Sequence, residues 1–79
     1  MNTATKLMKI ADDKAEVYGT YFGKKFTGKA KSSRQITVSP YPEQIWIETE
    51  PFEVLGRIAD SVLICSDDVD AGKHTVERK

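Results

Sequence analysis

The feature of this sequence that most restricts its fold is a series of short β-prone segments between Glu16 and Cys65. β-Branched and aromatic residues recur there, and glycine, proline or serine clusters interrupt them every few positions. This spacing is typical of strands joined by tight turns. We therefore predict a mainly β fold with five strands, over residues 16–22, 25–32, 36–38, 44–49, and 52–55 followed by 61–65 as a closing pair.

Turn signals separate these segments. Gly23 and Lys24 are expected to form a two-residue hairpin turn, because glycine adopts positive φ without steric cost. Residues 39–42, Ser-Pro-Tyr-Pro, form a further expected turn, and Glu50 with Pro51 marks a break between strands.

Alternation assigns faces to the segment 25–32. Phe26, Gly28 and Ala30 share one face, and lysines occupy the other. We expect the first face to point into the core, so Gly28 should not tolerate a bulky side chain.

Two later segments carry the other core candidates. Ile45 and Ile47 share one face of the segment 44–49, which leaves Trp46 on the opposite face. The run Val62–Cys65 is apolar without alternation. That run predicts a strand covered on both faces, or covered on one face by an oligomer.

The two ends of the chain are harder to assign. Leu7, Ile10 and Ala11 have helical spacing, but the stretch is short for a stable helix, so a strand or a helix remains open. Residues 70–79 contain one large apolar side chain, and we expect a frayed, polar, flexible tail. The folded part is therefore predicted as one small domain over residues 5–69.

Size and cysteine content restrict the class of protein further. The chain has 79 residues, one cysteine and one histidine, so Cys65 cannot form an internal disulfide, and His74 cannot assemble a zinc site with it. The first residues lack the apolar segment of a secretory signal, and no run is long enough to span a membrane. We expect a cytoplasmic protein with no cofactor, no metal and no membrane contact, and Cys65 as a core residue.

A resemblance adds to this interpretation. Residues Gly23–Ala30, GKKFTGKA, resemble the G-x-x-[aromatic]-x-G-x-[small apolar] hairpin of SH3-like β-barrel binding modules, among them Tudor-like and KOW-like domains. The resemblance implies a small SH3-like or related five-stranded barrel, in which Phe26 enters the core and Gly28 lets a bent strand cross its neighbour. The superfamily also contains type II dihydrofolate reductases, whose substrate residues form a V-Q-I-Y stretch on a late strand. The late strand here, Ser61–Cys65, departs from that stretch, so no catalytic residue is carried over.

Catalytic and metal-binding constellations are absent from the sequence pattern. Nucleophilic catalysis needs a positioned base, and His74, the single histidine, falls in the polar tail. The acidic stretch 66–72 lacks the ligand spacing of a calcium loop and is expected to be a solvated turn. We therefore predict no catalytic residue and no enzyme.

Charge is strongly segregated although the net charge is zero. Residues 1–34 carry eight basic and three acidic side chains, and residues 35–70 carry one basic and eight acidic. The densest basic run combines five cations with one phenylalanine, a pattern that can follow a phosphate backbone and stack on bases. Its members are Lys24, Lys25, Lys29, Lys31 and Arg34. The isoelectric point near 6.6 favours a lysine-rich solvent face, with acidic partners within the barrel or in another protomer.

Trp46 is the candidate contact with a partner. Its neighbours on the same face are Gln44 and Glu48, and a tryptophan among polar residues is typical of a protein interface, although burial under the N-terminal segment is an equal alternative. Tyr41, between two prolines, is a second candidate. We predict a non-catalytic binding module whose partner is protein, including a second copy of itself. The alternatives are a nucleic-acid-binding module that uses the basic run, and a small enzyme with its site at a symmetric oligomer interface.

Overall fold

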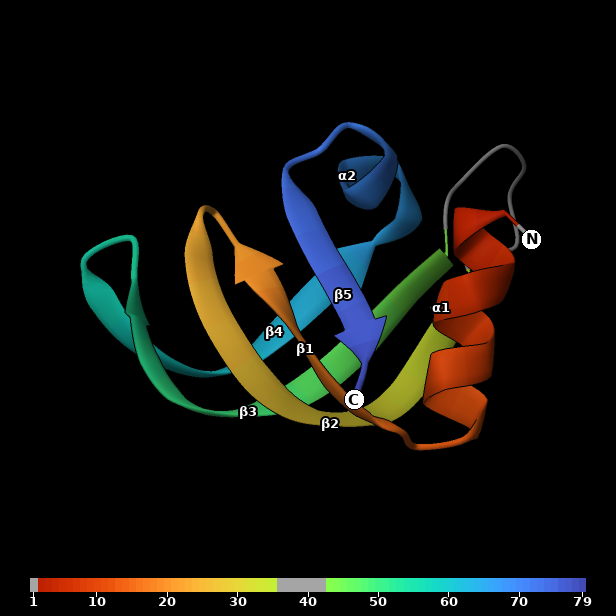
Figure 1. The fold of residues 1–79 in the computed structure, drawn as a ribbon, viewed down its shortest axis with the longest axis horizontal. Helices are drawn as coiled ribbons and strands as arrows, with labels where there is room; N and C mark the ends of the chain where they lie inside the picture. Colours follow the sequence, from red (N-terminus) through yellow and green to blue (C-terminus); the bar gives the residue numbers. More distant parts are fainter. Residues whose placement is uncertain (1, 36–42) are drawn as a thin grey trace.

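The computed structural model describes residues 2–35 and 43–79. Within these residues the chain forms one open antiparallel sheet of five strands, in the order β4-β3-β2-β1-β5, and two helices (Figure 1). The elements are α1 (Thr3–Asp12), β1 (Glu16–Tyr21), β2 (Lys24–Gln35), β3 (Glu43–Val54), β4 (Arg57–Cys65), α2 (Ser66–Asp70) and β5 (His74–Arg78). The strand expected at 36–38 and the turn at 39–42, with Tyr41, lie outside the described residues.

The N-terminal segment is a helix. Asn2 caps α1, because its side-chain oxygen accepts a hydrogen bond from the Thr5 backbone N–H at 2.8 Å. Leu7, Ile10 and Ala11 are buried against the sheet, as their spacing indicated. Packing of this apolar stripe stabilises a ten-residue helix that would be marginal in isolation.

Two tight hairpins shape the sheet. Phe22 and Gly23 both have positive φ and join β1 to β2, so that Tyr21 pairs with Lys24. The turn therefore lies one residue earlier than the predicted Gly23-Lys24 turn. Leu55 and Gly56 form a second turn of the same kind between β3 and β4. Positive φ at both central residues matches the right-handed twist of the flanking strands.

The predicted break at Glu50 and Pro51 is wrong, since β3 runs through both residues. The register of the β3–β4 pairing shifts between Glu48 and Phe52, so the proline lies in an irregularity. A proline is tolerated there because no ladder hydrogen bond is required of it. The last predicted strand was likewise too short, since β4 starts at Arg57.

The sheet does not close into a barrel. It curls so that β1 and β5 lie over β3 and β4 (Figure 1), but among the described residues β4 and β5 remain unpaired edges. The closed form of the expected SH3-like barrel is thus absent. A closed sheet would need a further ladder between these two strands.

Residues 74–78 form β5, which corrects the prediction of a frayed tail. The strand pairs with β1, and His74 and Val76 are both buried. Alternate residues of the segment therefore face the core. The composition of the segment did not indicate a strand, because it contains only one large apolar residue. A valine and a histidine that face the core are enough to form a short strand when a neighbouring strand supplies the backbone hydrogen bonds.

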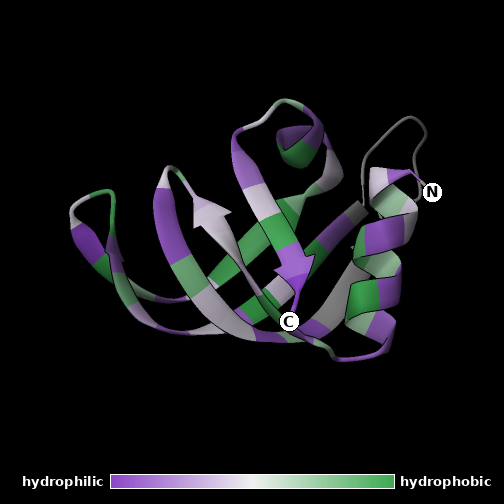
Figure 2. Cartoon of the chain, in the orientation of Figure 1, coloured by the Kyte–Doolittle hydropathy of each residue, from purple (hydrophilic) through white to green (hydrophobic). Residues whose placement is uncertain are grey.

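The core lies between the inner face of the sheet and α1. Figure 2 shows hydrophobic stretches in the middle of β3, β4 and β5 and along α1. Phe26 and Ala30 are buried as predicted. Gly28 lies between them on the inner face, and a Cβ placed there would overlap the Glu48 carbonyl oxygen of β3. Gly28 therefore permits a close approach of two strands.

Candidate interaction surface

The outer face of β3 and β4 presents an exposed apolar pair. Ile45 and Ile47 are buried, as predicted, and Trp46 points outward with 51% of its surface exposed. Trp46 pairs in register with Leu63 of β4, which is 48% exposed. Directly opposite residues share a face, so these two side chains form one apolar patch on the described chain.

Mostly polar residues border this pair. Gln44 pairs with Cys65 beyond one end of the patch, and Glu48 pairs with Ser61 beyond the other. Cys65 is half-buried, so the prediction that it is a core residue is wrong. We call these six residues, Gln44, Trp46, Glu48, Ser61, Leu63 and Cys65, the β3–β4 outer surface. The structure thus brings the predicted Gln44, Trp46 and Glu48 together.

Leu63 was missed by the sequence prediction. The run Val62–Cys65 was expected to be covered on both faces, or on one face by an oligomer. Val62 and Ile64 are buried and Leu63 is exposed, so the expected coverage of both faces within one chain is wrong. The uniform apolar run hid an ordinary alternation, because the outward residue is also apolar. Only the pairing of Leu63 with Trp46 reveals it as part of a surface.

A hollow of about 330 Å³ opens beside Trp46, where the register of β3 and β4 shifts. Carboxylates and an aromatic ring line it, and none of its lining residues is basic. These residues are Trp46, Glu48, Thr49, Pro51, Asp60 and Ser61. Among the described residues Asp60 has no ion-pair partner, and the buried Thr49 hydroxyl has no hydrogen-bond partner. We call this site the acidic hollow.

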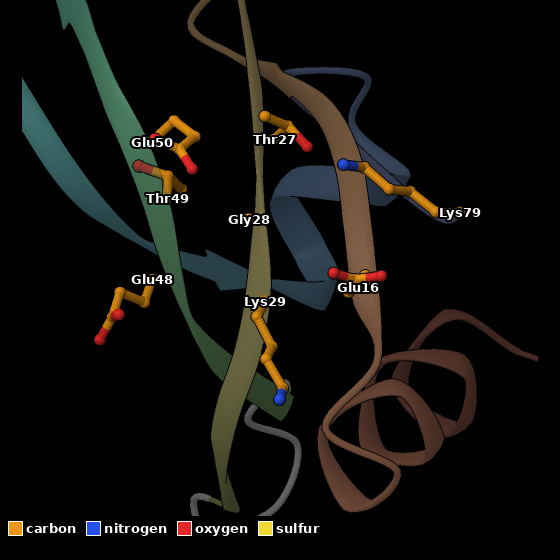
Figure 3. Close-up of a pocket in the computed structure, with 8 residues that line it drawn as sticks. All are labelled: Glu16, Thr27, Gly28, Lys29, Glu48, Thr49, Glu50 and Lys79. Atoms are coloured by element: carbon orange, nitrogen blue, oxygen red, sulfur yellow. The ribbon is translucent and has the colours of Figure 1, made fainter.

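The basic run does not form a continuous positive stripe. Lys29 pairs in register with Glu48 on one side and with Glu16 on the other, as Figure 3 shows. The Lys31 ammonium lies 3.9 Å from a Glu48 carboxylate oxygen. A second hollow, of about 360 Å³, combines three glutamates with Lys29 and Lys79. Charges therefore alternate across the strands.

Two further members of the basic run lie apart from these glutamates. Lys24 and Lys25 are exposed at the start of β2, beside the Phe22-Gly23 turn. Neither has an ion-pair partner among the described residues. The Arg34 side chain lies outside the description.

His74 has a packing role that the sequence did not reveal. Its Nδ1 accepts a hydrogen bond from the Phe22 backbone N–H at 3.3 Å, and its ring stacks on Tyr21 with centroids 4.4 Å apart. The Phe22 ring meets the imidazole edge-on at 4.8 Å. Nε2 lies 3.9 Å from an Asp68 carboxylate oxygen of α2. The imidazole therefore joins the β1–β2 turn to β5 and α2.

Metal-binding clusters and membrane-spanning helices are both absent from the part of the chain that the structure describes. No group of three or more histidine, cysteine or acidic side chains there could hold a metal ion. No described helix is both long and apolar enough to cross a membrane.

Comparison with known proteins gives no further guide. No family model matches the sequence, and no curated protein and no solved structure was found to match the chain.

Proposed function

We propose that this protein is a small non-catalytic binding module that contacts other proteins, including a second copy of itself, through the β3–β4 outer surface. The observation that carries this proposal is the cross-strand pair of Trp46 and Leu63, each about half exposed. Tryptophan is enriched among the residues that contribute most to protein interfaces. An apolar pair at the centre of a polar border has the arrangement of such a contact.

The edge position of β4 supports the same proposal. Ile58 on this strand is 69% exposed, and no described strand pairs with the outer edge of β4. Unpaired edge strands with apolar side chains readily contact another chain. The resemblance of residues 23–30 to a hairpin of SH3-like binding modules also supports a binding role.

Nucleic-acid binding is less well supported. A protein that follows a phosphate backbone needs cations that are free to replace counterions. Here Glu16 and Glu48 flank Lys29, and Lys31 lies against Glu48. We expect no tight binding to duplex DNA at physiological salt.

The proposal is tested by measuring the mass in solution. Light scattering should show association of the wild type between about 1 μM and about 1 mM, the range that corresponds to association free energies of about −8 to −4 kcal/mol. Replacing Trp46 and Leu63 by Ser should raise the dissociation constant by more than about tenfold, since central aromatic contacts often contribute about 2 kcal/mol or more.

Tyr18→Ser is the matched control. Tyr18 lies on β1 and is 49% exposed, close to the value for Trp46. Its loss should leave association unchanged. A wild type that stays monomeric over the whole range, or an equal effect of Tyr18→Ser, contradicts the proposal.

A further inference from the structure

The tip of the β1–β2 hairpin carries two exposed lysines next to a turn that is packed against the rest of the molecule. Its turn has two residues, and the Phe22 ring packs edge-on against Tyr21 and His74 at 4.8 Å in both cases. The buried imidazole also accepts a hydrogen bond from the Phe22 N–H. The two lysines that follow the turn are exposed and have no ion-pair partner among the described residues. The tip thus presents ammonium groups, unpaired within the described chain, beside a turn that His74 contacts.

The acidic hollow has the opposite character. Glu48 and Asp60 line it with Trp46, and none of its lining residues is basic, although the Lys31 ammonium lies 3.9 Å from the Glu48 carboxylate. A carboxylate beside an aromatic ring suits an ammonium group, because the ring face and the carboxylate both attract positive charge. Asp60 in particular has no ion-pair partner in the described chain.

We propose that the acidic hollow receives the hairpin tip of a second copy of this chain, with Lys24 or Lys25 directed at Asp60, the carboxylate of the hollow that has no ion-pair partner among the described residues. The proposal rests on the self-association proposed above and names the charges that direct it. The segregation of charge along the chain supports a second copy as the occupant. Residues 1–34 carry an excess of five positive charges, eight minus three, and residues 35–70 an excess of seven negative charges, eight minus one.

The contact joins two different surfaces, one on each copy. In a dimer with twofold symmetry, the tip of each copy would lie in the hollow of the other copy, and no binding site would remain unoccupied. Without such an axis the copies would form a ring or an open chain. The same charges direct all of these assemblies, so a test of the charges does not depend on the symmetry.

Charge reversal tests the proposal. Asp60→Lys alters the hollow alone, and Lys24→Glu combined with Lys25→Glu alters the tip alone. Each variant by itself should lose more than about tenfold in association constant, because like charges would meet in the contact. An equimolar mixture of the two variants should associate again, since each tip then faces a hollow of opposite sign. Glu53→Lys and Lys14→Glu, exposed changes outside both sites, serve as controls and should associate like the wild type.

Each outcome of this experiment is decisive. Restored association in the mixture supports the proposal and also shows that both variants fold. Wild-type association of either charge variant, or failure of the mixture of two folded variants to associate, overturns it while self-association through Trp46 and Leu63 stands.

If circular dichroism shows that Asp60→Lys is unfolded, Asp60→Asn replaces it and must weaken association by at least about twofold, the scale of an exposed ion pair. A monomeric wild type overturns both proposals.

Discussion

The two edge strands of the sheet are built in different ways. β5 has five residues, and two of its charged side chains form ion pairs with a residue of α1 and with the residue that follows α1. The Lys6 ammonium lies 2.8 Å from a Glu77 carboxylate oxygen, and the Arg78 guanidinium lies 2.9 Å from Asp13. β4 has nine residues, and within the described chain its charged residues, Arg57 and Asp60, have no ion-pair partner.

The difference extends to the apolar residues of the two strands. Val76 of β5 belongs to the core, whereas Ile58 and Leu63 of β4 are exposed. Edge strands are usually shortened, charged or covered so that they do not pair with other chains. β5 is short and tied to a helix, and its side chains serve the stability of the monomer. β4 leaves Ile58 and Leu63 exposed, and the proposed contact lies on this side of the sheet.

The largest expected effect on stability comes from two glycines that let neighbouring strands approach closely. Gly19 lies where β1 meets β5, and Gly28 lies where β2 meets β3. A Cβ at Gly19 would overlap the Thr75 carbonyl oxygen of β5, and a Cβ at Gly28 would overlap the Glu48 carbonyl oxygen of β3. Gly19→Val and Gly28→Val should each lower the free energy of unfolding by about 3 kcal/mol or more, because backbone must move. Urea denaturation followed by circular dichroism measures this.

Gly72→Ala is the control for these two variants. Gly72 has positive φ, but a Cβ at this position would meet no atom within 4 Å, so conformational strain of about 1 kcal/mol is the expected cost. Equal losses of unfolding free energy in Gly19→Val and Gly28→Val would show that the β1–β5 and β2–β3 pairings contribute equally to stability. The difference between β4 and β5 would then be confined to their outer edges. Wild-type stability of Gly19→Val would mean that β5 is not held against β1 as described.

A smaller effect separates the roles of the two edges. Val76→Ala removes buried methyl groups and should lower the free energy of unfolding by about 1.5–3 kcal/mol. Leu63→Ala removes exposed groups and should change it by less than about 0.5 kcal/mol while weakening self-association. Urea denaturation at low protein concentration, paired with light scattering, separates these effects. A Leu63→Ala variant as destabilised as Val76→Ala would remove the distinction between a structural edge and a binding edge.

Local patterns of the sequence predicted much of the fold. The faces of Phe26, Ala30, Ile45 and Ile47 followed from alternation, because period-two burial depends only on neighbours along the chain. The sequence does not decide between a helix and a strand at the N-terminus, because the stability of this helix comes from packing on the sheet. β5 was missed for the same reason, since its burial depends on pairing with a strand more than fifty residues away.

The sequence pattern likewise predicts some residues of the candidate site and not others. Trp46, Gln44 and Glu48 are alternate residues of one strand, so the sequence could place them on one face. Leu63 and Asp60 join them only through the register of β3 with β4, and the acidic hollow exists because that register shifts. A register shift depends on contacts across strands and has no local pattern. Tyr41, the other predicted contact, lies outside the described residues.

The smallest expected effect concerns the ion pair that ties β5 to the end of α1. The hydrogen bond from Arg78 lowers the pKa of Asp13 below its ordinary value of 3.8, with smaller contributions from the charges of Lys9 and Arg78, against a partial desolvation that raises it. Because the pKa is lower in the folded state, this group stabilises the fold fully above about pH 4, and the contribution is lost as the pH falls through the folded pKa. Asp13→Asn should therefore be slightly less stable than the wild type near neutral pH, and the two should converge in strong acid. Urea denaturation across this range measures the difference, with Asp12→Asn as the neighbouring control. A difference between wild type and Asp13→Asn that persists unchanged in strong acid would show that the carboxylate charge does not hold β5 to the helix.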